Sequence, residues 1–271
     1  AVDAFQSVNP GLQVTGFPLR SEANRSIAAE LSARPGNSAP AFDEVFLDPT
    51  DGSLIGGRQT GPGIGPRNFV AGVADLHFEK GSYLSQYASP VPRYDSRATL
   101  AALSALIDRY QPASVVCLGD SFHDRGAFAR ITFQDSEALL ALTKRVSDWV
   151  WVVGNHDPDI PVSVAGKVVE HWQVSIADKS LIGCHEPDPA LEHHCQIVGH
   201  FHPKGQLAMQ KGVVRGKCLV ATSSLMVMPA LGQFTGGLSV QDPVMVTLAP
   251  VAERQCWMLY RGRVYQLPAG S

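Results

Sequence analysis

Short apolar, β-prone segments alternate with amphipathic helical segments from residue 69 onward, and this alternation constrains the fold most strongly. The apolar segments are 69–75 (FVAGVAD), 114–120 (SVVCLGD) and 149–157 (WVWVVGNHD). Between them lie two helical patterns, 94–110 (YDSRATLAALSALIDRY) and 135–148 (DSEALLALTKRVSD). Such a β-α-β-α-β order is typical of an α/β fold, in which helices cover a largely parallel sheet.

The first helical pattern is the more detailed of the two. Asp95 or Ser96 can cap it, Pro112 follows its end, and an apolar face recurs at helical spacing. That face consists of Leu100, Leu103, Ile107 and Tyr110. After about residue 165 the chain reads mostly as strands, at 179–186 (KSLIGCHE), 195–202 (CQIVGHFH), 217–225 (KCLVATSSL), 245–250 (MVTLAP) and a closing hairpin at 256–268 (CWMLYRGRVYQLP).

Residues 1–66 differ from the remainder because they are rich in Gly, Pro, Ser and Asn. One ordered piece is expected there, since residues 43–57 (DEVFLDPTDGSLIGG) place β-prone residues on both sides of a strong turn signal. This piece resembles the hairpin of PepSY-type domains, and a simple added β-hairpin is the alternative. We therefore expect an extension at 1–66 that contains a hairpin, followed by the main domain at 67–271.

Composition excludes several classes of protein. With 271 residues, 45% of them apolar, the chain can bury a sizeable core, and its formal charge of −3 argues against a dominant nonspecific grip on nucleic acid. No apolar stretch approaches the roughly 18 residues that cross a bilayer, and the start shows no signal-peptide pattern. The five cysteines are widely spaced and form no C-x-x-C, so we expect reduced core residues and a cytoplasmic protein.

Polar signatures end five of the apolar segments. In open α/β sheets, the loops beyond the carboxyl ends of the strands form the ligand site, so these side chains should meet at one rim. Each signature alone is an ordinary loop, but five in chain order make coincidence a poor explanation. The residues are Asp75 and His77, Asp120, Asn155 with His156 and Asp157, His185, and the pair His200 and His202.

Carboxylate, amide oxygen and imidazole are the ligands of divalent cations such as Mn²⁺, Fe²⁺ and Zn²⁺. Two such ions held about 3.5–4 Å apart need a bridging anion, and Asp120 is the candidate because it stands alone after its strand. A pair of ions would clamp a phosphate and generate hydroxide near neutral pH. The pattern therefore predicts a two-metal centre that acts on phosphate esters, with Mn²⁺ as the best fit.

The ordered motifs ADLH, LGDSFHD, VGNHD, GCHEP and VGHFH resemble the signature of calcineurin-like metallophosphoesterases over about residues 69–267. Further sequence segments, such as VADLHFEKGS, MPALGQFTGGLSV and RGRVYQLP, resemble those of the bacterial ligase-associated DNA damage response endonucleases, the PdeM group. The resemblance implies a four-layer α/β/β/α sandwich. It also implies a phosphodiesterase, and through the PdeM group a DNA-processing nuclease that works alongside a DNA ligase or helicase system.

Residue roles follow from the same resemblance. It implies that Asp75, His77 and His202 bind one metal, that Asn155, His185 and His200 bind the other, and that Asp120 bridges them. A metal-bridging hydroxide would attack phosphorus in line, while His156 would protonate or hydrogen-bond the leaving oxygen and Asp157 would hold its ring. Gly199 would let the backbone come close before the last His pair.

Four further residues are weaker candidates for supporting a ligand or binding substrate: His123, Asp124, Arg125 and Lys204. For His123, a purely structural role in its loop is equally consistent with the sequence. Lys204 opens the stretch 203–218, which carries Lys204, Lys211, Arg215 and Lys217 and no acid. This stretch predicts either a surface for a nucleic-acid backbone or a solvated hairpin face, and no interleaved aromatic residue supports base stacking there.

Two alternatives to a phosphodiesterase stay open. One is a phosphomonoesterase or pyrophosphatase of nucleotides or sugar-nucleotide lipids. The other is a scaffold that keeps the fold without the chemistry, although every ligand position is filled here. The sequence predicts no oligomeric state.

Overall fold

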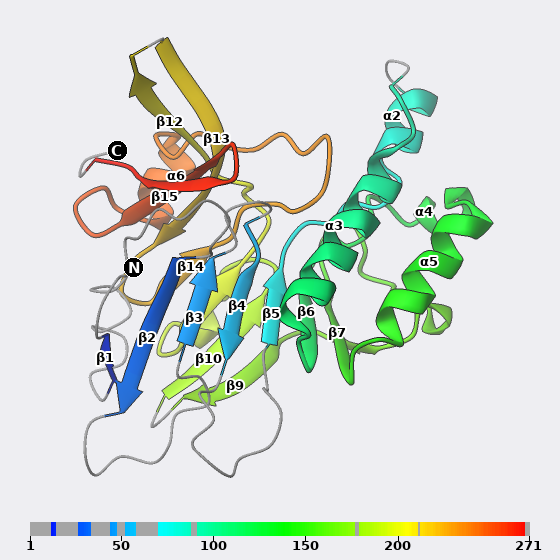
Figure 1. Ribbon diagram of the computed structural model, residues 1–271, viewed down its shortest axis with the longest axis horizontal. Helices are drawn as coiled ribbons and strands as arrows, with labels where there is room; N and C mark the ends of the chain where they lie inside the picture. The colour runs from blue at the N-terminus through cyan, green and yellow to red at the C-terminus, as the bar shows by residue number, and fades with distance from the viewer. Residues whose placement is uncertain are drawn as a thin grey trace.

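The computed structural model describes residues 12–14, 27–33, 44–47, 52–57, 70–87, 91–176, 179–210 and 212–268. Two sheets pack against each other, with helices over the outer face of the first (Figure 1). Among the described helices, none is long and apolar enough to cross a membrane. Half of the first sheet is parallel, and the second sheet packs behind it. The predicted α/β fold is confirmed.

The strands of the first sheet lie side by side in the order in which they occur along the chain, from β1 to β8. Its strands β1 to β5 pair antiparallel, whereas β5 to β8 pair parallel. The strands are β1 (Leu12–Val14), β2 (Ile27–Ala33), β3 (Glu44–Leu47), β4 (Leu54–Gly57), β5 (Val70–Val73), β6 (Ser114–Leu118), β7 (Asp148–Val152) and β8 (Lys167–Val169).

The second sheet has the order β16-β15-β13-β14-β11-β10-β9, and β12 pairs with β13 beside it. Its centre is parallel, because β10, β11 and β14 run in the same direction. The strands are β9 (Trp172–Ile176), β10 (Lys179–Cys184), β11 (Cys195–Val198), β12 (Lys204–Met209), β13 (Gly212–Ala221), β14 (Leu225–Val227), β15 (Gln255–Tyr260) and β16 (Arg263–Gln266).

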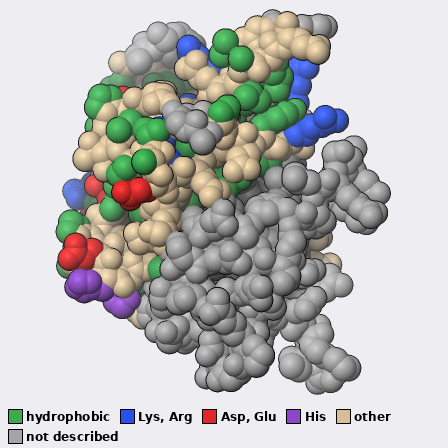
Figure 2. Space-filling model, turned by 90° about the vertical axis from the view of Figure 1, so that its left-hand side faces the viewer, with side chains coloured by type: hydrophobic (Ala, Val, Ile, Leu, Met, Phe, Trp, Pro, Cys, Tyr) green, Lys and Arg blue, Asp and Glu red, His purple; other side chains and the backbone are tan. Residues whose placement is uncertain are grey.

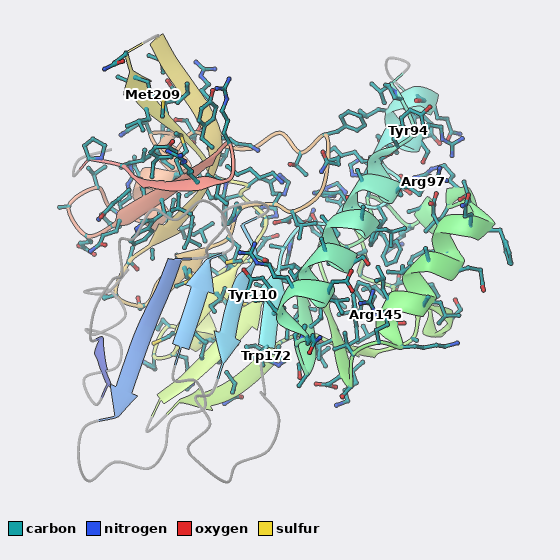
Figure 3. All side chains as sticks on the ribbon, in the orientation of Figure 1. Tyr94, Arg97, Tyr110, Arg145, Trp172 and Met209 are labelled. Atoms are coloured by element: carbon teal, nitrogen blue, oxygen red, sulfur yellow. The ribbon has the colours of Figure 1, made fainter. Side chains whose placement is uncertain are left out.

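Among the described residues, most helices lie on the first sheet's side of the molecule and the last lies on the second's (Figures 1 and 3). They are α2 (Lys80–Tyr87), α3 (Asp95–Tyr110), α4 (Ala127–Arg130), α5 (Phe133–Thr143) and, after the second sheet, α6 (Pro243–Leu248); short 3-10 turns occupy Val162–Val164 and Pro189–Leu191. The fourth layer is therefore thin, because α6 has only 6 residues.

Side chains along the central strands point alternately to the two faces of each sheet, and those of the described residues form three buried cores. In β6, Val115 and Cys117 face α3 and α5, whereas Val116 and Leu118 face the second sheet. In β13, Leu219 faces the first sheet, and its neighbours along the strand pack on the α6 side. Since successive strand residues point to opposite faces, each central strand contributes to two cores at once.

Two local predictions were wrong. The segment 245–250 is not a strand: Asp242 caps a helix there, its side chain accepting from the Val244 N–H, with Pro243 at the first helical position. The first turn of α3 is not capped by Asp95 or Ser96, because Asp95 accepts from the Gly81 N–H and Ser96 binds Glu79. Both side chains instead join α3 to the start of α2.

The expected hairpin corresponds to β3 and β4, which pair antiparallel with Leu47 opposite Leu54. Strand β4 also pairs with β5, so the hairpin continues the first sheet rather than standing apart from it. Apart from β1 and β2, the other residues of 1–42 lie outside the described part of the chain, as do residues 48–51 of the turn. A domain boundary near residue 66 and the PepSY-type likeness remain predictions.

Candidate metal centre

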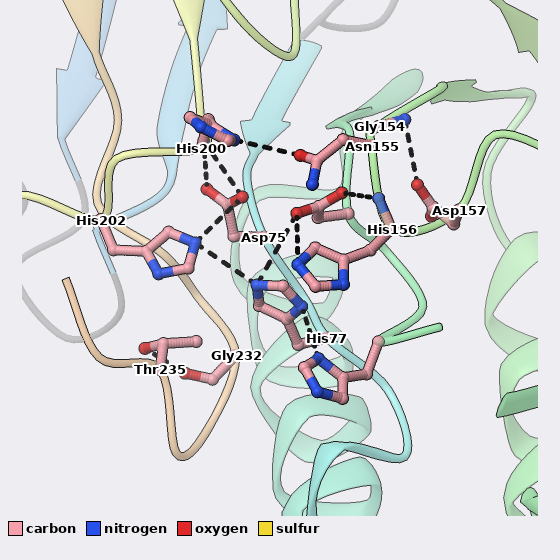
Figure 4. A network of polar contacts seen from close by, with 12 residues as sticks. Asp75, His77, Gly154, Asn155, His156, Asp157, His200, His202, Gly232 and Thr235 are labelled. Carbon is pink, nitrogen blue, oxygen red and sulfur yellow. Dashed lines mark hydrogen bonds and ion pairs between the residues drawn. The ribbon is translucent and has the colours of Figure 1, made fainter. Parts of the chain in front are cut away.

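The loops that follow five strands meet at one rim of the two sheets. The first sheet supplies loops after β5, β6 and β7, which are parallel neighbours, and the second supplies loops after β10 and β11. Because parallel strands end at the same edge, their loops carry the polar signatures to one place (Figure 4). All seven predicted ligands lie there: Asp75, His77, Asp120, Asn155, His185, His200 and His202.

A first group of donors consists of Asp75, His77 and His202, whose ligand atoms lie within 4.8 Å of one another. His202 Nε2 is 3.1 Å from Asp75 Oδ1, and His77 Nε2 is 3.3 Å from His202 Nε2. Asp75 and His77 are buried, and His202 is partly exposed. The group is therefore largely shielded from solvent, and His202 is its partly exposed member.

A second group consists of Asp120, His185 and His200, again within 4.8 Å. Asn155 completes it: its Oδ1 lies 2.9 Å from His185 Nε2 and 3.1 Å from His200 Nδ1. The amide oxygen and the two ring nitrogens thus point at a common centre.

Asp120 lies between the two groups. Its Oδ2 is 3.3 Å from His185 Nε2 in the second group and 4.0 Å from His77 Nε2 in the first. The same carboxylate also accepts the His156 N–H through Oδ1 at 2.9 Å. Asp75 Oδ1 also lies 3.9 Å from His185, but at the Nδ1 that faces the Leu118 carbonyl, so Asp120 is the carboxylate that approaches the Nε2 atoms of both His77 and His185.

The donor set fits divalent cations. Burial lowers the pKa of His77 to about 2, so this ring is neutral and offers a lone pair. Two imidazole nitrogens facing each other at 3.3 Å beside a carboxylate form a pocket of acceptors that a cation would satisfy. Imidazole, carboxylate and amide oxygen together suit Mn²⁺, Fe²⁺ or Zn²⁺ and offer no thiolate.

Asp120 Oδ2 and His185 Nε2 lie 3.3 Å apart and are placed to form an ion pair. Burial opposes the charge of Asp120, but the hydrogen bond and the charge of His185 outweigh it and bring the pKa of Asp120 to about 2. Burial likewise opposes the charge of His185, yet Asp120 raises the pKa of His185 to about 9. A bound cation would replace that proton as the partner of the carboxylate.

Backbone strain is concentrated at the same residues. Among the described non-glycine residues with positive φ, five of ten are candidate ligands: Asp75 (53°), His77 (46°), Asp120 (46°), His200 (66°) and His202 (47°). Left-handed backbone is costly for residues with a Cβ and persists where the surrounding structure imposes it, typically at functional sites. Gly199 fits the sequence expectation, since a Cβ there would lie 2.7 Å from Asp75 Oδ2.

His156 sits at the open side of the centre, with its Nε2 3.9 Å from Asp120 Oδ2 and its side chain 40% exposed. Its ring stacks on His123 at 5.1 Å, and His123 Nδ1 is 3.3 Å from His77 Nδ1. His123 therefore contacts both a candidate ligand and the predicted leaving-group residue, as the supporting role would require.

Asp157 does not hold the His156 ring in the way that the sequence suggested. Its Oδ2 accepts from the Phe122 N–H and its Oδ1 from the Gly154 N–H. The buried carboxylate thus fastens the loop after β6 to the loop after β7, and Figure 4 shows its bond to Gly154.

The three weaker candidates have different surroundings. Asp124 forms a bidentate pair with Arg130, at 3.0 and 2.8 Å, which ties it to α4 rather than to a ligand. Arg125 is exposed and pairs with Asp159 at 3.4 Å. Lys204 opens β12 two residues after His202, and burial lowers its pKa.

Two features of the site had no assigned role in the sequence. Burial lowers the pKa of Lys80, while the charges of Asp120 and Asp75 oppose that shift, so its ammonium lies within the field of the centre. Its signal was its position just after the motif ADLH. The loop around Gly232 and Thr235 also reaches the centre, because Gly232 donates its N–H to the Asp75 carbonyl at 3.0 Å.

Comparison with known proteins places these observations in a family. The calcineurin-like phosphoesterase family matches residues 70–204, a range that includes all seven candidate ligands. The chain contains a calcineurin-like phosphoesterase domain. The calcineurin-like domain makes the protein a metal-dependent phosphoester hydrolase, and its paired groups of candidate metal ligands agree with that chemistry.

The calcineurin-like fold also appears in a solved structure described as Pseudomonas putida nuclease MPE. The two chains are 23% identical, with a TM-score of 0.60 over 90% of this chain and 100% of that one. At this identity the likeness shows the fold. None of the proteins of curated function matches the sequence.

Proposed function

We propose that this protein is a phosphodiesterase with a two-metal centre and that nucleic acid is its substrate. The observation that carries the proposal is the position of Asp120, whose Oδ2 lies within 4.0 Å of donors from both groups. In the proposed arrangement Asp75, His77 and His202 hold one cation, Asn155, His185 and His200 hold the other, and Asp120 is shared.

The metals, when bound, would supply Lewis acidity that neutralises a phosphate and activates water. Mn²⁺ is the preferred candidate, with Fe²⁺ and Zn²⁺ as alternatives. The chain's own part is to keep the donors in place: Asp75 accepts the His200 N–H at 3.1 and 3.0 Å, which locks the loop after β11 against the loop after β5.

His156 is proposed to assist the departing ester oxygen. Its exposed ring stands beside the shared carboxylate, and the stack on His123 restricts its orientation. A proton donor or hydrogen-bond donor at that position stabilises charge as it develops on the leaving group. His123 is a positioning residue in this scheme because it contacts His156 and His77.

Two comparisons favour a diester, and DNA in particular, as the substrate. The structural relative is named as a nuclease, and the motifs VADLHFEKGS and MPALGQFTGGLSV resemble the ligase-associated endonucleases. A functional link with a DNA ligase or helicase is part of this proposal. The five cysteines, none of them in a disulfide and four of them buried, support a reducing, cytoplasmic setting.

The deciding experiment supplies the purified protein with Mn²⁺ and measures hydrolysis of bis(p-nitrophenyl) phosphate, p-nitrophenyl phosphate and DNA. We expect the diester and DNA to be hydrolysed faster than the monoester, and the Asp75→Asn protein to be inactive on all three. Faster hydrolysis of the monoester would favour the phosphomonoesterase alternative. A pyrophosphate-linked nucleotide is assayed in the same way, and activity on that substrate alone would favour the pyrophosphatase alternative. Failure to bind any metal would point to a scaffold.

A further inference from the structure

The ring of His156 is held beside the candidate metal centre by other rings. Its side chain is 40% exposed, and its Nε2 lies 3.9 Å from Asp120 Oδ2, which is beyond hydrogen-bond distance. Among the described residues, its ring contacts are a T-shaped one with His77, with centroids 5.3 Å apart, and the stack on His123, with centroids 5.1 Å apart and planes 20° from parallel. The stack therefore restricts the orientation of an otherwise exposed imidazole.

His123 is packed in turn against Tyr83 of α2. The two ring centroids lie 4.7 Å apart at an interplanar angle of 80°, a T-shaped arrangement that aromatic pairs prefer. His123 is buried and Tyr83 is partly exposed. The His123 N–H also donates to the Phe78 carbonyl at 3.0 Å, which fixes the backbone beneath the ring. Tyr83, His123 and His156 thus form a continuous row of three rings, here called the ring row.

The position of Tyr83 is fixed by the first turn of α2. Its N–H donates to the Glu79 carbonyl at 3.1 Å. Glu79 in turn donates its N–H to Ser96 Oγ at 2.9 Å, and Gly81 donates its N–H to Asp95 Oδ2 at 2.7 Å. These buried bonds join the start of α2 to the start of α3, so the outer end of the ring row rests on a braced helix.

Arg130 ties Tyr83 to the loop that carries His123. The guanidinium carbon lies 6.0 Å from the centroid of the Tyr83 ring, and Nε donates to Ser82 Oγ at 3.0 Å. The same guanidinium donates to both carboxylate oxygens of Asp124, at 3.0 and 2.8 Å, and Asp124 directly follows His123. One arginine therefore holds two members of the ring row in register.

We propose that Tyr83 is a positioning residue for His156 that acts through His123: the Tyr83 ring keeps the His123 ring in place, and the His123 ring keeps His156 directed at the leaving oxygen. The inference rests on the proposed function and deepens it by naming a residue that sets the assistance to the leaving group. An acid is effective only when it reaches the oxygen that it protonates, and a small misplacement of such a group lowers the rate strongly.

The first test measures how strongly hydrolysis depends on the leaving group. The substrates are methyl aryl phosphates, from the ester of p-nitrophenol, which leaves without a proton, to the ester of phenol, which needs one. With the Mn²⁺-loaded protein, Tyr83→Ala should lower kcat about tenfold for the phenyl ester, because a misdirected acid protonates poorly. For the p-nitrophenyl ester kcat should stay within about twofold, and KM should change for neither ester, since Tyr83 acts on His156 and not on the substrate.

Two variants serve as controls. Tyr83→Phe keeps the ring and should restore the parent kcat for the phenyl ester, because the contact with His123 is made between rings. Phe133→Ala removes another aromatic residue, 82% exposed at the start of α5, and should leave the hydrolysis of every ester unaffected. Parent-like hydrolysis of the p-nitrophenyl ester by Tyr83→Ala also shows that this variant is folded and holds its metals.

The second test does not use hydrolysis. It records the side-chain NMR resonances of His156 in EDTA, assigned by comparison with His156→Ala. Tyr83→Ala should shift these resonances, although Tyr83 does not touch His156, because the His123 ring between them moves; Tyr83→Phe should shift them much less. Histidines on the face shown in Figure 2, which lies at the opposite end of the molecule from α2 in Figure 1, are references that should not shift.

An equal loss of kcat for all esters in Tyr83→Ala, or no loss for any of them, overturns the inference. So do His156 resonances that stay in place in that variant. The proposed function is judged separately, by the parent protein. If the parent hydrolyses none of the esters, the proposed function fails, and the NMR comparison alone decides whether Tyr83 orients His156.

Discussion

At the scale of single residues, the shared carboxylate of Asp120 decides how the two donor groups are coupled. It contacts His185 in one group and approaches His77 in the other, and it also accepts the His156 N–H. Replacing it should therefore affect both groups at once. A ligand that belongs to one group only, such as Asn155, should affect mainly one ion.

Asp120→Asn should weaken binding of both metals by at least tenfold, because the amide lacks the charge that bridges two cations. Elemental analysis after equilibrium dialysis against Mn²⁺ measures this directly. Asp159→Asn is the matched control, since Asp159 is exposed and pairs only with exposed Arg125 among the interactions described. Two metals per chain in Asp120→Asn would contradict the bridging role.

His156→Ala should lower kcat by about 10²–10⁴-fold for a diester with a poor leaving group, the range typical of a general acid. The loss should be much smaller with p-nitrophenolate, which leaves without a proton. Metal content should not change, because the ring is not among the grouped donors. An equal loss with both leaving groups would argue against a role at the leaving oxygen.

The sequence predicted which residues meet because the argument needed only chain order and parallel strands. It did not predict that Asp157 binds backbone at Phe122 and Gly154, since that depends on a side-chain direction. The loop that begins at Gly232 was missed for another reason. It is fixed by backbone contacts to Asp75 and Phe201, and glycines at positions where a Cβ would clash do not by themselves indicate a site.

At the scale of elements, the junctions between strands and ligand loops are tight, and the one before His200 shows why. Gly199 follows β11, and its Cα faces Asp75, the Leu118 carbonyl and Ala74. Any side chain at this position would push the second sheet's loop away from the first sheet's. The two groups of donors depend on that close approach.

Gly199→Ala should destabilise the protein by about 1–3 kcal/mol, the usual cost of overpacking, and should also weaken metal binding because it displaces Asp75. Urea denaturation and Mn²⁺ titration measure the two effects. Gly236→Ala is the control for stability, since a Cβ there would meet nothing within 4 Å. A Gly199→Ala protein of normal stability would show that the junction can relax.

Elements were predicted well where periodicity was long and poorly where it was short. The 16-residue α3 was evident from its apolar face, and β6 and β7 from their apolar runs. Helix α6 has only six residues, and its apolar, β-branched composition favours a strand. The Asp-Pro pair at its start is a helix signal, and it outweighed that strand preference. The α3 cap was wrong because tertiary contacts to Glu79 and Gly81 claimed both capping side chains.

At the scale of the whole molecule, the reactivity of the cysteine thiols measures how well the core excludes solvent. Cys117, Cys184, Cys218 and Cys256 are buried, whereas Cys195 is partly exposed. Burial raises the pKa of Cys184 to about 11, so its reactive thiolate is scarce near neutral pH. The native protein should therefore react quickly with Ellman's reagent at one thiol.

Cys195→Ser should remove that fast phase and leave the slow reaction of the other thiols, which requires unfolding. Guanidinium chloride should expose four thiols in the variant and five in the parent. A fast phase of undiminished amplitude in Cys195→Ser would mean that one of the strands assigned to the core opens readily.

The candidate metal centre also joins the two sheets, since its donors come from loops after β5, β6 and β7 on one side and β10 and β11 on the other. A cation in either group binds both sheets, so it should stabilise the packed sandwich against separation. With free Mn²⁺ at 100 times its dissociation constant, binding to the native state alone adds about 2.7 kcal/mol to the free energy of unfolding. The melting temperature should therefore rise with Mn²⁺ concentration and fall on addition of EDTA. Asp120→Asn should show a much smaller rise, and Asp159→Asn the full one. Bound Mn²⁺ without any rise in melting temperature would mean that the unfolded chain binds the ions equally well, so that their binding does not depend on the packed sheets.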